Sequence, residues 1–502
     1  MPNPLYDTLL GRHATRETTF LHLPDGGSVS YAEFHRMAGR QAAAIRELGL
    51  QPGDRVAAQV GKSAEALALF FACARGGFVF LPLNTGYTPE EVAYFVENSG
   101  ARLFLCDPAS EAALAPVADA SGALLEALRE GGGSFADRAA GQDAEFPIVD
   151  REAGDLAAFL YTSGTTGRSK GAMLSQENLL SNAEVLAEYW RFTDSDVLLH
   201  ALPIFHTHGL FVATNTVMLA GGSMILLPKF ELDAVIAALP RATSMMGVPT
   251  FYTRLLSDPR FDRDLVGHMR LFTSGSAPML EETHHQFETR TGQRILERYG
   301  MTETNMSTSN PYEGERRAGT VGFPLPGVEL KICDADGREV AQGEIGTIEV
   351  RGANVFQGYW GMPEKTAEEL RPDGFFITGD LAQMDADGYV TIVGRGKDLI
   401  ISGGFNIYPK ELEQELDEMP GVLESAVVGA PHPDFGESPV GVLVPLPGET
   451  PDLDAIRAAL REKLASFKQP KELVVIEELP RNTMGKVQKA ELRARYKDIF
   501  GG

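Results

Sequence analysis

Residues 161–171 are Tyr161-Thr162-Ser163-Gly164-Thr165-Thr166-Gly167-Arg168-Ser169-Lys170-Gly171, a segment that follows the apolar run DLAAFL and precedes an amphipathic helix expected to begin near Ser175. Small hydroxyl residues and glycines let backbone N–H groups converge on an anion, and Lys170 adds a cation. The segment does not match the GxxxxGK[ST] pattern of a Walker loop. A solvated surface loop can contain the same residue types, but this mixture with its terminal lysine favours a polyphosphate-binding loop.

Apolar runs alternate with helical patterns on the amino-terminal side of this loop. DRVAAQV (54–60) precedes SAEALALFFACARGG (63–77), FVFLPL (78–83) precedes TPEEVAYFVENSG (88–100), and ARLFLC (101–106) follows. This alternation is typical of strand–helix units in a parallel sheet, so we expect an α/β fold. The stretch 108–146 is rich in Ala, Gly and Asp and predicts a surface excursion with a short helix around Leu124 to Arg129.

Length and charge restrict the possible functions. The chain has 502 residues, of which 43% are apolar, enough for two or more domains with sizeable cores. Its 45 Lys and Arg residues face 69 Asp and Glu residues, which gives a net charge of −24. Because an acidic surface repels nucleic acids and anionic membranes, we expect neither as a partner. Any anionic substrate must therefore be held by a few placed cations.

Cysteine usage and local hydropathy indicate a cytoplasmic protein. Cys73, Cys106 and Cys333 are far apart and form neither a disulfide framework nor a metal-binding pattern. No secretory leader is recognisable at the amino terminus. The uncharged stretch 209–228 reaches the length of a membrane span. Polar residues at 214–216 and a Gly221-Gly222 pair interrupt it, so a helix, a glycine turn and a buried strand are the favoured interpretation.

The pattern changes near residue 395. Beyond it, apolar residues at helical spacing (Leu412, Leu416 and Met419) precede two strand-like runs, a second helical stripe and a third strand-like run. We therefore expect a large body over residues 1–395, with several subdomains and mixed or parallel sheets, and a small α+β lid over residues 396–502. The segment GRGKD at 394–398 would join them.

Four further motifs follow the loop in order: YGMTET at 299–304, TGD at 378–380, GRGKDLIISGGFNIYP at 394–409 and PRNTMGKVQK at 480–489. Together they resemble the adenylate-forming superfamily of acyl-CoA synthetases, adenylation domains and luciferases, over nearly the whole chain. The resemblance implies ATP, Mg²⁺ and coenzyme A as ligands. It also implies a lid that rotates about Lys397 between adenylate formation and thioester formation.

The resemblance also implies roles for single residues. Lys486 would bridge the attacking carboxylate and the α-phosphate, Thr302 would contact the AMP phosphate, and Glu303 would hold Mg²⁺, a cation that prefers oxygen ligands. Thr162 is expected as a second metal ligand. Phosphate, adenine, ribose and pantetheine contacts are implied for Thr162, Ser163, Gly164, Thr165, Thr166, Gly167 and Lys170; for Ser274, Gly275, Ser276, Ala277, Pro278, Glu297, Arg298 and Tyr299; for Asp380 and Arg395; and for Ser402, Gly403 and Gly404.

The acid substrate is suggested by a second level of resemblance. GVPT at 247–250 followed by Arg254, together with ERYGMTETNM at 297–306, looks like the malonyl-CoA synthetase subgroup. Arg254 is expected as a buried cation that would pair with the second carboxylate of malonate, because a guanidinium is a planar bidentate partner. His206, Ser276 and Met306 would complete the acid pocket.

Several alternatives remain open at this level. Methylmalonate or another short acid, including a monocarboxylate, is an alternative substrate. A carrier-loading module and a non-catalytic nucleotide-binding protein are less favoured. A monomer or weak homo-oligomer is expected.

Overall fold

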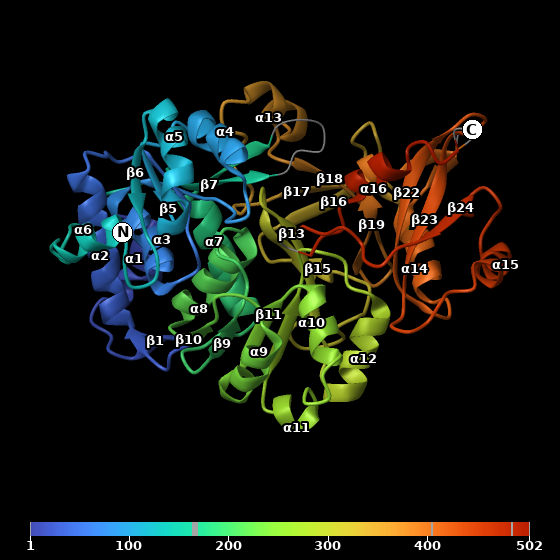
Figure 1. Cartoon of the computed structure of the whole chain (residues 1–502), viewed down its shortest axis with the longest axis horizontal. Coiled ribbons are helices and arrows are strands. Elements are labelled where there is room, and N and C mark those ends of the chain that lie inside the picture. Colours follow the sequence, from blue (N-terminus) through green and yellow to red (C-terminus); the bar gives the residue numbers. More distant parts are fainter. Residues whose placement is uncertain (1, 163–168, 403–404, 483–484, 501–502) are drawn as a thin grey trace. The chain divides into compact units, whose positions relative to one another are not determined.

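The computed structural model describes residues 2–162, 169–402, 405–482 and 485–500. The chain divides into two compact units (Figure 1). Unit 1 comprises Met1–Ala318, Gly322–Glu329 and Val350–Phe376, and unit 2 comprises Gly319–Val321, Leu330–Glu349 and Ile377–Gly502. The predicted lid, residues 396–502, lies within unit 2, which also takes in the strands that precede it. The hinge at Lys397 remains a prediction.

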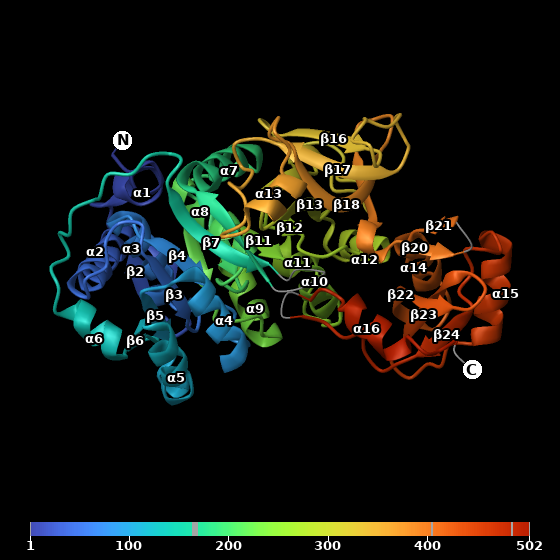
Figure 2. The same cartoon turned by 90° about the horizontal axis from the view of Figure 1, so that it is seen from above.

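A six-stranded sheet forms the amino-terminal part of unit 1 (Figure 2). Its neighbouring strands pair in parallel, except for the antiparallel pair β7–β8. Helices α3 (Ala64–Gly76) and α4 (Pro89–Ser99) connect strands of this sheet, as the alternating pattern predicted. In sheet order the strands are β6 (Leu124–Ala127), β5 (Leu103–Cys106), β3 (Arg55–Gln59), β4 (Val79–Pro82), β7 (Leu156–Thr162) and β8 (Lys170–Ser175).

The helix predicted around Leu124 to Arg129 is wrong. Residues Leu124–Ala127 form strand β6, which pairs in parallel with β5 from Leu103↔Leu124 to Cys106↔Ala127. A short apolar run does not distinguish a strand from a helical turn, and here the open edge of β5 supplies backbone partners. The helix of this region, α6, begins later and spans Ser134–Ala140.

A nine-stranded sheet forms the second layer of unit 1. Its central strands β9 to β13 are parallel, and the β13–β14 and β1–β2 pairs are antiparallel. In sheet order the strands are β15 (Phe323–Pro324), β14 (Asn305–Ser309), β13 (Leu296–Met301), β12 (Leu271–Ser274), β11 (Ser244–Gly247), β9 (Val197–His200), β10 (Ser223–Leu226), β1 (Thr19–His22) and β2 (Ser28–Ser30).

Helices pack on both sheets and bury their apolar faces. One core cluster lies between α9, α10, α12 and the nine-stranded sheet, with Tyr252, Phe272 and Phe287 fully buried. The remaining helices of unit 1 are α1 (Pro4–Leu9), α2 (Tyr31–Glu47), α5 (Glu111–Ser121), α7 (Gln176–Tyr189), α8 (Thr214–Ala220), α9 (Leu232–Ala238), α10 (Pro249–Leu256), α11 (Arg263–Val266), α12 (Glu281–Thr291) and α13 (Pro363–Glu369).

The uncharged stretch 209–228 has the predicted helix–turn–strand structure. A π-helical segment, η3 (His208–Ala213), runs into α8, and Gly221 ends α8 with a left-handed φ of 76° before strand β10. Glycine suits this position because other residues adopt positive φ at a cost. Within the described part of the chain, no helix is long and apolar enough to cross a membrane.

Unit 2 contains two sheets. The four-stranded sheet has the order β16 (Glu329–Cys333), β17 (Gly346–Arg351), β18 (Phe376–Met384) and β19 (Val390–Arg395). The five-stranded sheet has the path β21 (Phe405–Ile407), β20 (Ile400–Ser402), β23 (Gly436–Pro445) and β22 (Val422–His432), and β24 (Glu472–Val475) pairs with β23. Its helices are α14 (Pro409–Asp417), α15 (Leu453–Lys463) and α16 (Lys489–Tyr496).

Candidate active site

The predicted phosphate loop joins β7 to β8. Thr162 ends β7 and lies opposite Lys170, the first residue of β8, in the antiparallel ladder. The Thr162 hydroxyl donates a hydrogen bond of 3.4 Å to the Lys170 carbonyl oxygen. The hairpin therefore places a hydroxyl and an ammonium group on adjacent strands. The predicted phosphate contacts Ser163, Gly164, Thr165, Thr166 and Gly167 lie outside the described residues.

Lys170 is held by an acidic and aromatic environment within unit 1. Its Nζ lies 3.1 and 3.2 Å from the two carboxylate oxygens of Glu369 and 4.1 Å from the centre of the Tyr359 ring. The Tyr359 hydroxyl donates to Glu369 at 2.6 Å and also lies 3.0 Å from a carboxylate oxygen of Glu303. This network connects the phosphate-loop lysine to the predicted metal ligand.

Glu303 lies in the turn between β13 and β14, beside Thr302. It is only 4% exposed, and its backbone carbonyl accepts a hydrogen bond of 2.8 Å from the Phe356 amide. Among the described residues, no cluster of three or more acidic, His or Cys side chains could hold a metal by itself. A buried carboxylate fits Mg²⁺, which is usually held by one or two carboxylates and substrate phosphates. Glu303 is therefore suited to that ion, whereas Thr162 as a second ligand remains a prediction.

A strained loop follows β12. Ser276 has a positive φ of 69°, a conformation that costs energy for residues other than glycine. Its hydroxyl lies 3.2 Å from Nδ1 of His208. Ser274, at the end of β12, is buried, and its hydroxyl has no hydrogen-bond partner among the described residues. Ala277 and Pro278 continue this loop towards the surface.

Arg298 is a buried cation on β13. It is 3% exposed, and its Nε and Nη2 atoms have no hydrogen-bond partner within the described structure. Burial lowers the pKa of the Arg298 guanidinium to about 9, so it remains charged at pH 7. Polar groups buried without a partner are uncommon and costly. An anionic ligand at this position would remove that cost.

Two histidines follow β9. His208 is fully buried, its backbone amide donates to Nδ1 of His206 at 3.3 Å, and its Nε2 has no partner among the described residues. Burial and then the charge of Arg298 hold the pKa of His208 well below its usual range, so this imidazole is neutral. The adjacent Thr207 hydroxyl donates to the side chain of Asn305 at 2.8 Å. The histidine segment is thereby attached to the start of β14.

Met306 and Glu297 lie in the same part of unit 1. Met306 is 2% exposed on β14, and its backbone exchanges hydrogen bonds with the side chain of Asn182. Glu297 is buried on β13 and lies 3.2 Å from Nδ1 of His284. Tyr299, two residues further along β13, is half-buried.

Arg254 is exposed. It lies on α10, whose Tyr252 and Leu255 face the core, so its side chain is out of phase with the buried face. The expectation that Arg254 is a buried cation is therefore wrong, whereas its contact with substrate remains a prediction. The buried arginine of this region is Arg298.

Unit 2 brings two predicted ribose ligands together. Asp380 on β18 and Arg395 on β19 are directly opposite each other in the antiparallel ladder. Nε of Arg395 lies 2.9 Å from a carboxylate oxygen of Asp380, which is 4% exposed. A buried carboxylate beside a guanidinium can accept hydrogen bonds from vicinal hydroxyl groups.

The other predicted residues of unit 2 differ in exposure. Lys397 is exposed in a short 3₁₀ helix, and Ser402 is buried at the end of β20, whereas Gly403 and Gly404 lie outside the described residues. Lys486 is exposed, and its backbone exchanges hydrogen bonds of 3.0 Å with Asn482. These hydrogen bonds hold Lys486 next to Asn482.

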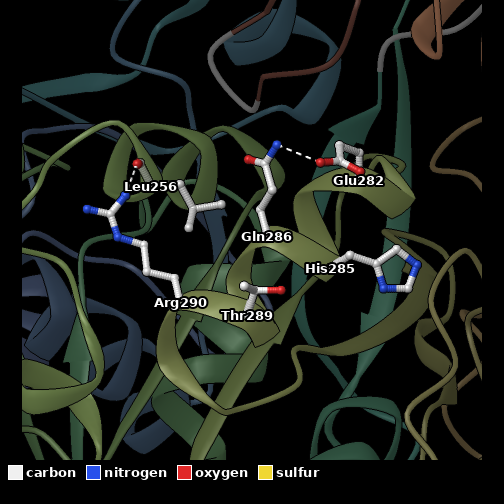
Figure 3. Close-up of a pocket in the computed structure, with 6 residues that line it drawn as sticks. All are labelled: Leu256, Glu282, His285, Gln286, Thr289 and Arg290. Atoms are coloured by element: carbon white, nitrogen blue, oxygen red, sulfur yellow. Dashed lines mark hydrogen bonds between the residues drawn. The ribbon is translucent and has the colours of Figure 1, made fainter.

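A separate hollow of about 530 Å³ lies on unit 1 at the end of α10 and along α12 (Figure 3). Its polar side chains pair locally: Gln286 donates to Glu282 at 2.7 Å, and Arg290 donates to the Leu256 carbonyl at 2.5 Å. None of the predicted site residues lines it, so we assign it no role. Its lining residues are Leu256, Glu282, His285, Gln286, Thr289 and Arg290.

Comparison with known families identifies the class of protein. The family model "AMP-binding enzyme" matches residues 11–360, and "AMP-binding enzyme C-terminal domain" matches residues 411–486. The chain belongs to the AMP-binding enzyme family, which confirms the resemblance recognised in the sequence.

Particular relatives cover the chain almost completely. The structure of ATP-bound MatB from Rhodopseudomonas palustris is 55% identical, with a TM-score of 0.98 and full coverage of both chains. A feruloyl-CoA synthase from an Amycolatopsis species is 38% identical and covers 94% of each chain. The malonate–CoA ligase of Arabidopsis thaliana is 34% identical and covers 91% of this chain and 80% of its own length.

Sequence reasoning did not identify Tyr359 and Glu369, whose side chains contact Lys170, and it placed Arg298 among the cofactor contacts, which remains a prediction. A signal for Arg298 was present, because an arginine inside the strand-like run ILERYGM is expected to be buried or paired. Glu369 carried no comparable signal, since it lies in the mixed charged segment PEKTAEEL.

Proposed function

We propose that this enzyme is an AMP-forming malonate–CoA ligase. The malonate carboxylate would attack the α-phosphate of ATP to form malonyl-AMP and pyrophosphate. The thiol of coenzyme A would then displace AMP to form malonyl-CoA. The malonate–CoA ligase of Arabidopsis supports this acid, and ATP-bound MatB supports the nucleotide.

The observation that carries the choice of acid is the buried, incompletely paired guanidinium of Arg298. A dicarboxylate has one carboxylate to activate and a second that can pair with this cation. Hydrogen bonds to charged groups contribute about 1.5 to 3 kcal/mol, so a monocarboxylate should lose roughly one to two orders of magnitude in kcat/KM. His208 is neutral and adjoins Ser276, so these side chains can donate to the same carboxylate without adding charge.

The remaining residues act on the nucleotide. Lys170 would pair with the phosphates, and Asp380 with Arg395 would bind the ribose hydroxyls. Lys486 would stabilise the charge that develops at the α-phosphate. Mg²⁺, when bound by Glu303 and Thr162, supplies neutralisation of the phosphate charge. Residues 396–502 would rotate about Lys397 between the two half-reactions.

The direct test is an acid panel. The purified protein is mixed with ATP, Mg²⁺ and coenzyme A, and AMP and the thioester are measured with malonate, methylmalonate, acetate, propionate and ferulate. We expect malonate to give the highest kcat/KM, with methylmalonate second. Preference for acetate or ferulate would contradict malonate as the acid. If none of these acids led to AMP formation, the proposal that the enzyme activates any of these carboxylic acids would be contradicted.

A further inference from the structure

Glu369 is an acidic partner of the phosphate-loop lysine in this structure. Both carboxylate oxygens of Glu369 lie within 3.2 Å of the Lys170 Nζ atom, and the two side chains are only 23% and 16% exposed. Two carboxylate oxygens facing an ammonium group reproduce the arrangement that two phosphate oxygens would make. A triphosphate that paired with Lys170 would therefore compete with Glu369 for the same ammonium group.

Glu369 has two further donors. The ammonium group of Lys365 lies 3.0 Å from one carboxylate oxygen, and the Tyr359 hydroxyl donates to the other at 2.6 Å. If Lys170 moved away, Glu369 would therefore keep a cation and a hydroxyl donor. This makes the loss of the Lys170 contact tolerable, because a partly buried carboxylate without donors is costly.

Tyr359 connects this contact to Glu303. Its hydroxyl lies within hydrogen-bond distance of both carboxylates, at 3.0 Å from Glu303 and 2.6 Å from Glu369. A phenol has one hydrogen, so it donates fully to only one of them at a time. A cation that bound Glu303 would leave that hydrogen wholly to Glu369, and the strengthened hydrogen bond would compensate for the departure of Lys170.

We propose that Glu369 is an internal counter-ion that a nucleoside triphosphate must displace from Lys170, and that Tyr359 links this displacement to metal binding at Glu303. The proposal rests on the proposed function only in taking Lys170 as a phosphate ligand and Glu303 as a metal ligand. Glu369 weakens nucleotide binding in the absence of metal. Tyr359 is a positioning residue, since it acts through the two carboxylates.

The chain offers a matched pair of variants. Glu369→Gln removes the negative charge and keeps the size and the acceptor for Tyr359. Glu368→Gln is the control, because Glu368 lies on the same helix and pairs with Lys365 at 2.7 Å, whereas Lys170 pairs with Glu369. Calorimetric titration with ATP, with and without Mg²⁺, measures the affinity independently of turnover. We expect Glu369→Gln to bind ATP three- to tenfold more tightly without Mg²⁺, and Glu368→Gln to match the wild type.

Tyr359→Phe tests the link. We expect the Mn²⁺ concentration for half-maximal ATP binding to rise several-fold in this variant, and bound Mn²⁺ is measured by electron paramagnetic resonance. Unchanged or weaker ATP binding by Glu369→Gln would overturn the proposal that Glu369 is a counter-ion of Lys170. An unchanged Mn²⁺ requirement in Tyr359→Phe would overturn the proposal that Tyr359 links this contact to metal binding at Glu303. Failure of malonate as the acid leaves these titrations unaffected, whereas absence of ATP binding by the wild type would overturn both proposals.

Discussion

Gly275 and Arg298 compete for the same space: a Cβ atom on Gly275 would lie 2.0 Å from Nη1 of Arg298. The glycine at this position therefore makes room for the guanidinium. An added methyl group would displace the Arg298 guanidinium. Because this guanidinium is buried, it cannot move aside into solvent as an exposed side chain could. Gly275 is thus a determinant of where the charge of Arg298 lies.

We expect Gly275→Ala to destabilise the protein by about 1–3 kcal/mol, the usual cost of inserting a methyl group into a packed region. It should also raise the KM for malonate, because the guanidinium moves. Thermal unfolding and steady-state kinetics measure the two effects. Gly141→Ala is the control, since Gly141 has a φ of −80° and its nearest neighbour to an added Cβ is at 3.5 Å. Equal behaviour of the two variants would contradict the steric argument.

Arg298 and Arg254 are two candidates for the partner of the second carboxylate. We expect Arg298→Met to lower kcat/KM for malonate by about 10- to 150-fold, the equivalent of about 1.5–3 kcal/mol, with a smaller effect on acetate. Arg254→Ala should change both acids less than threefold, because its side chain is exposed. If Arg254→Ala causes the larger loss of kcat/KM, and only for malonate, then Arg254 binds the second carboxylate, as the sequence predicted. Arg298 would then not have this role.

Lys486 separates the two half-reactions. We expect Lys486→Ala to abolish ATP–pyrophosphate exchange while keeping thioester formation from supplied malonyl-AMP near the wild-type rate. The reason is that charge develops at the α-phosphate only in the first half-reaction. Lys497→Ala, which removes another exposed lysine of the same unit, should leave both rates unchanged. Normal exchange in Lys486→Ala would exclude its catalytic role.

The raised pKa of Asp417 predicts that the stability of unit 2 depends on pH. Burial raises the pKa of Asp417 to about 7, with the Ser425 hydroxyl donating to it at 2.7 Å and Lys410 and Glu413 as its charged neighbours. The folded state therefore binds the proton more tightly than the unfolded state, whose pKa is near 3.8. This contribution to stability is complete below the unfolded pKa and is lost as the pH rises through about 7.

Asp417→Asn keeps the acceptor for Ser425 and removes the ionisation. The variant should have a higher unfolding temperature than the wild type at pH 8, and the difference should shrink at pH 5.5. Differential scanning calorimetry at the two pH values measures this. A difference that is independent of pH would show that Asp417 does not titrate in this range.

The main architecture could be predicted because its signals are local. Runs such as DRVAAQV and FVFLPL are buried on both faces of a parallel sheet and lack alternation, and glycines and polar caps mark the ends of the intervening helices. The helix–strand order beyond residue 409 was recognisable for the same reason. The prediction for Leu124–Ala127 was wrong because four residues are too few to show a helical or strand periodicity. Their strand conformation depends on pairing with the edge of β5.

The candidate active site could be predicted only in part, because its members meet through tertiary structure. The ordered motifs pointed to Glu303, Asp380 and Arg395, and the cross-strand pairing of the last two follows from their hairpin. Whether an arginine is buried depends on helix phase at Arg254 and strand direction at Arg298. Lys170 and Glu369 are 199 positions apart, so no local pattern reveals their contact.

The pairing of β1 with β10 has a consequence for how the chain folds during synthesis. Residues Leu21 and His22 are in register with Met224 and Ile225, so β1 can pair with β10 only after about 200 further residues have been synthesised. At translation rates of about 5–20 residues per second, the roughly 200 intervening residues take about 10–40 s to emerge. Throughout that interval β1 has an open edge, and on a ribosome it is a natural place for a chaperone to bind.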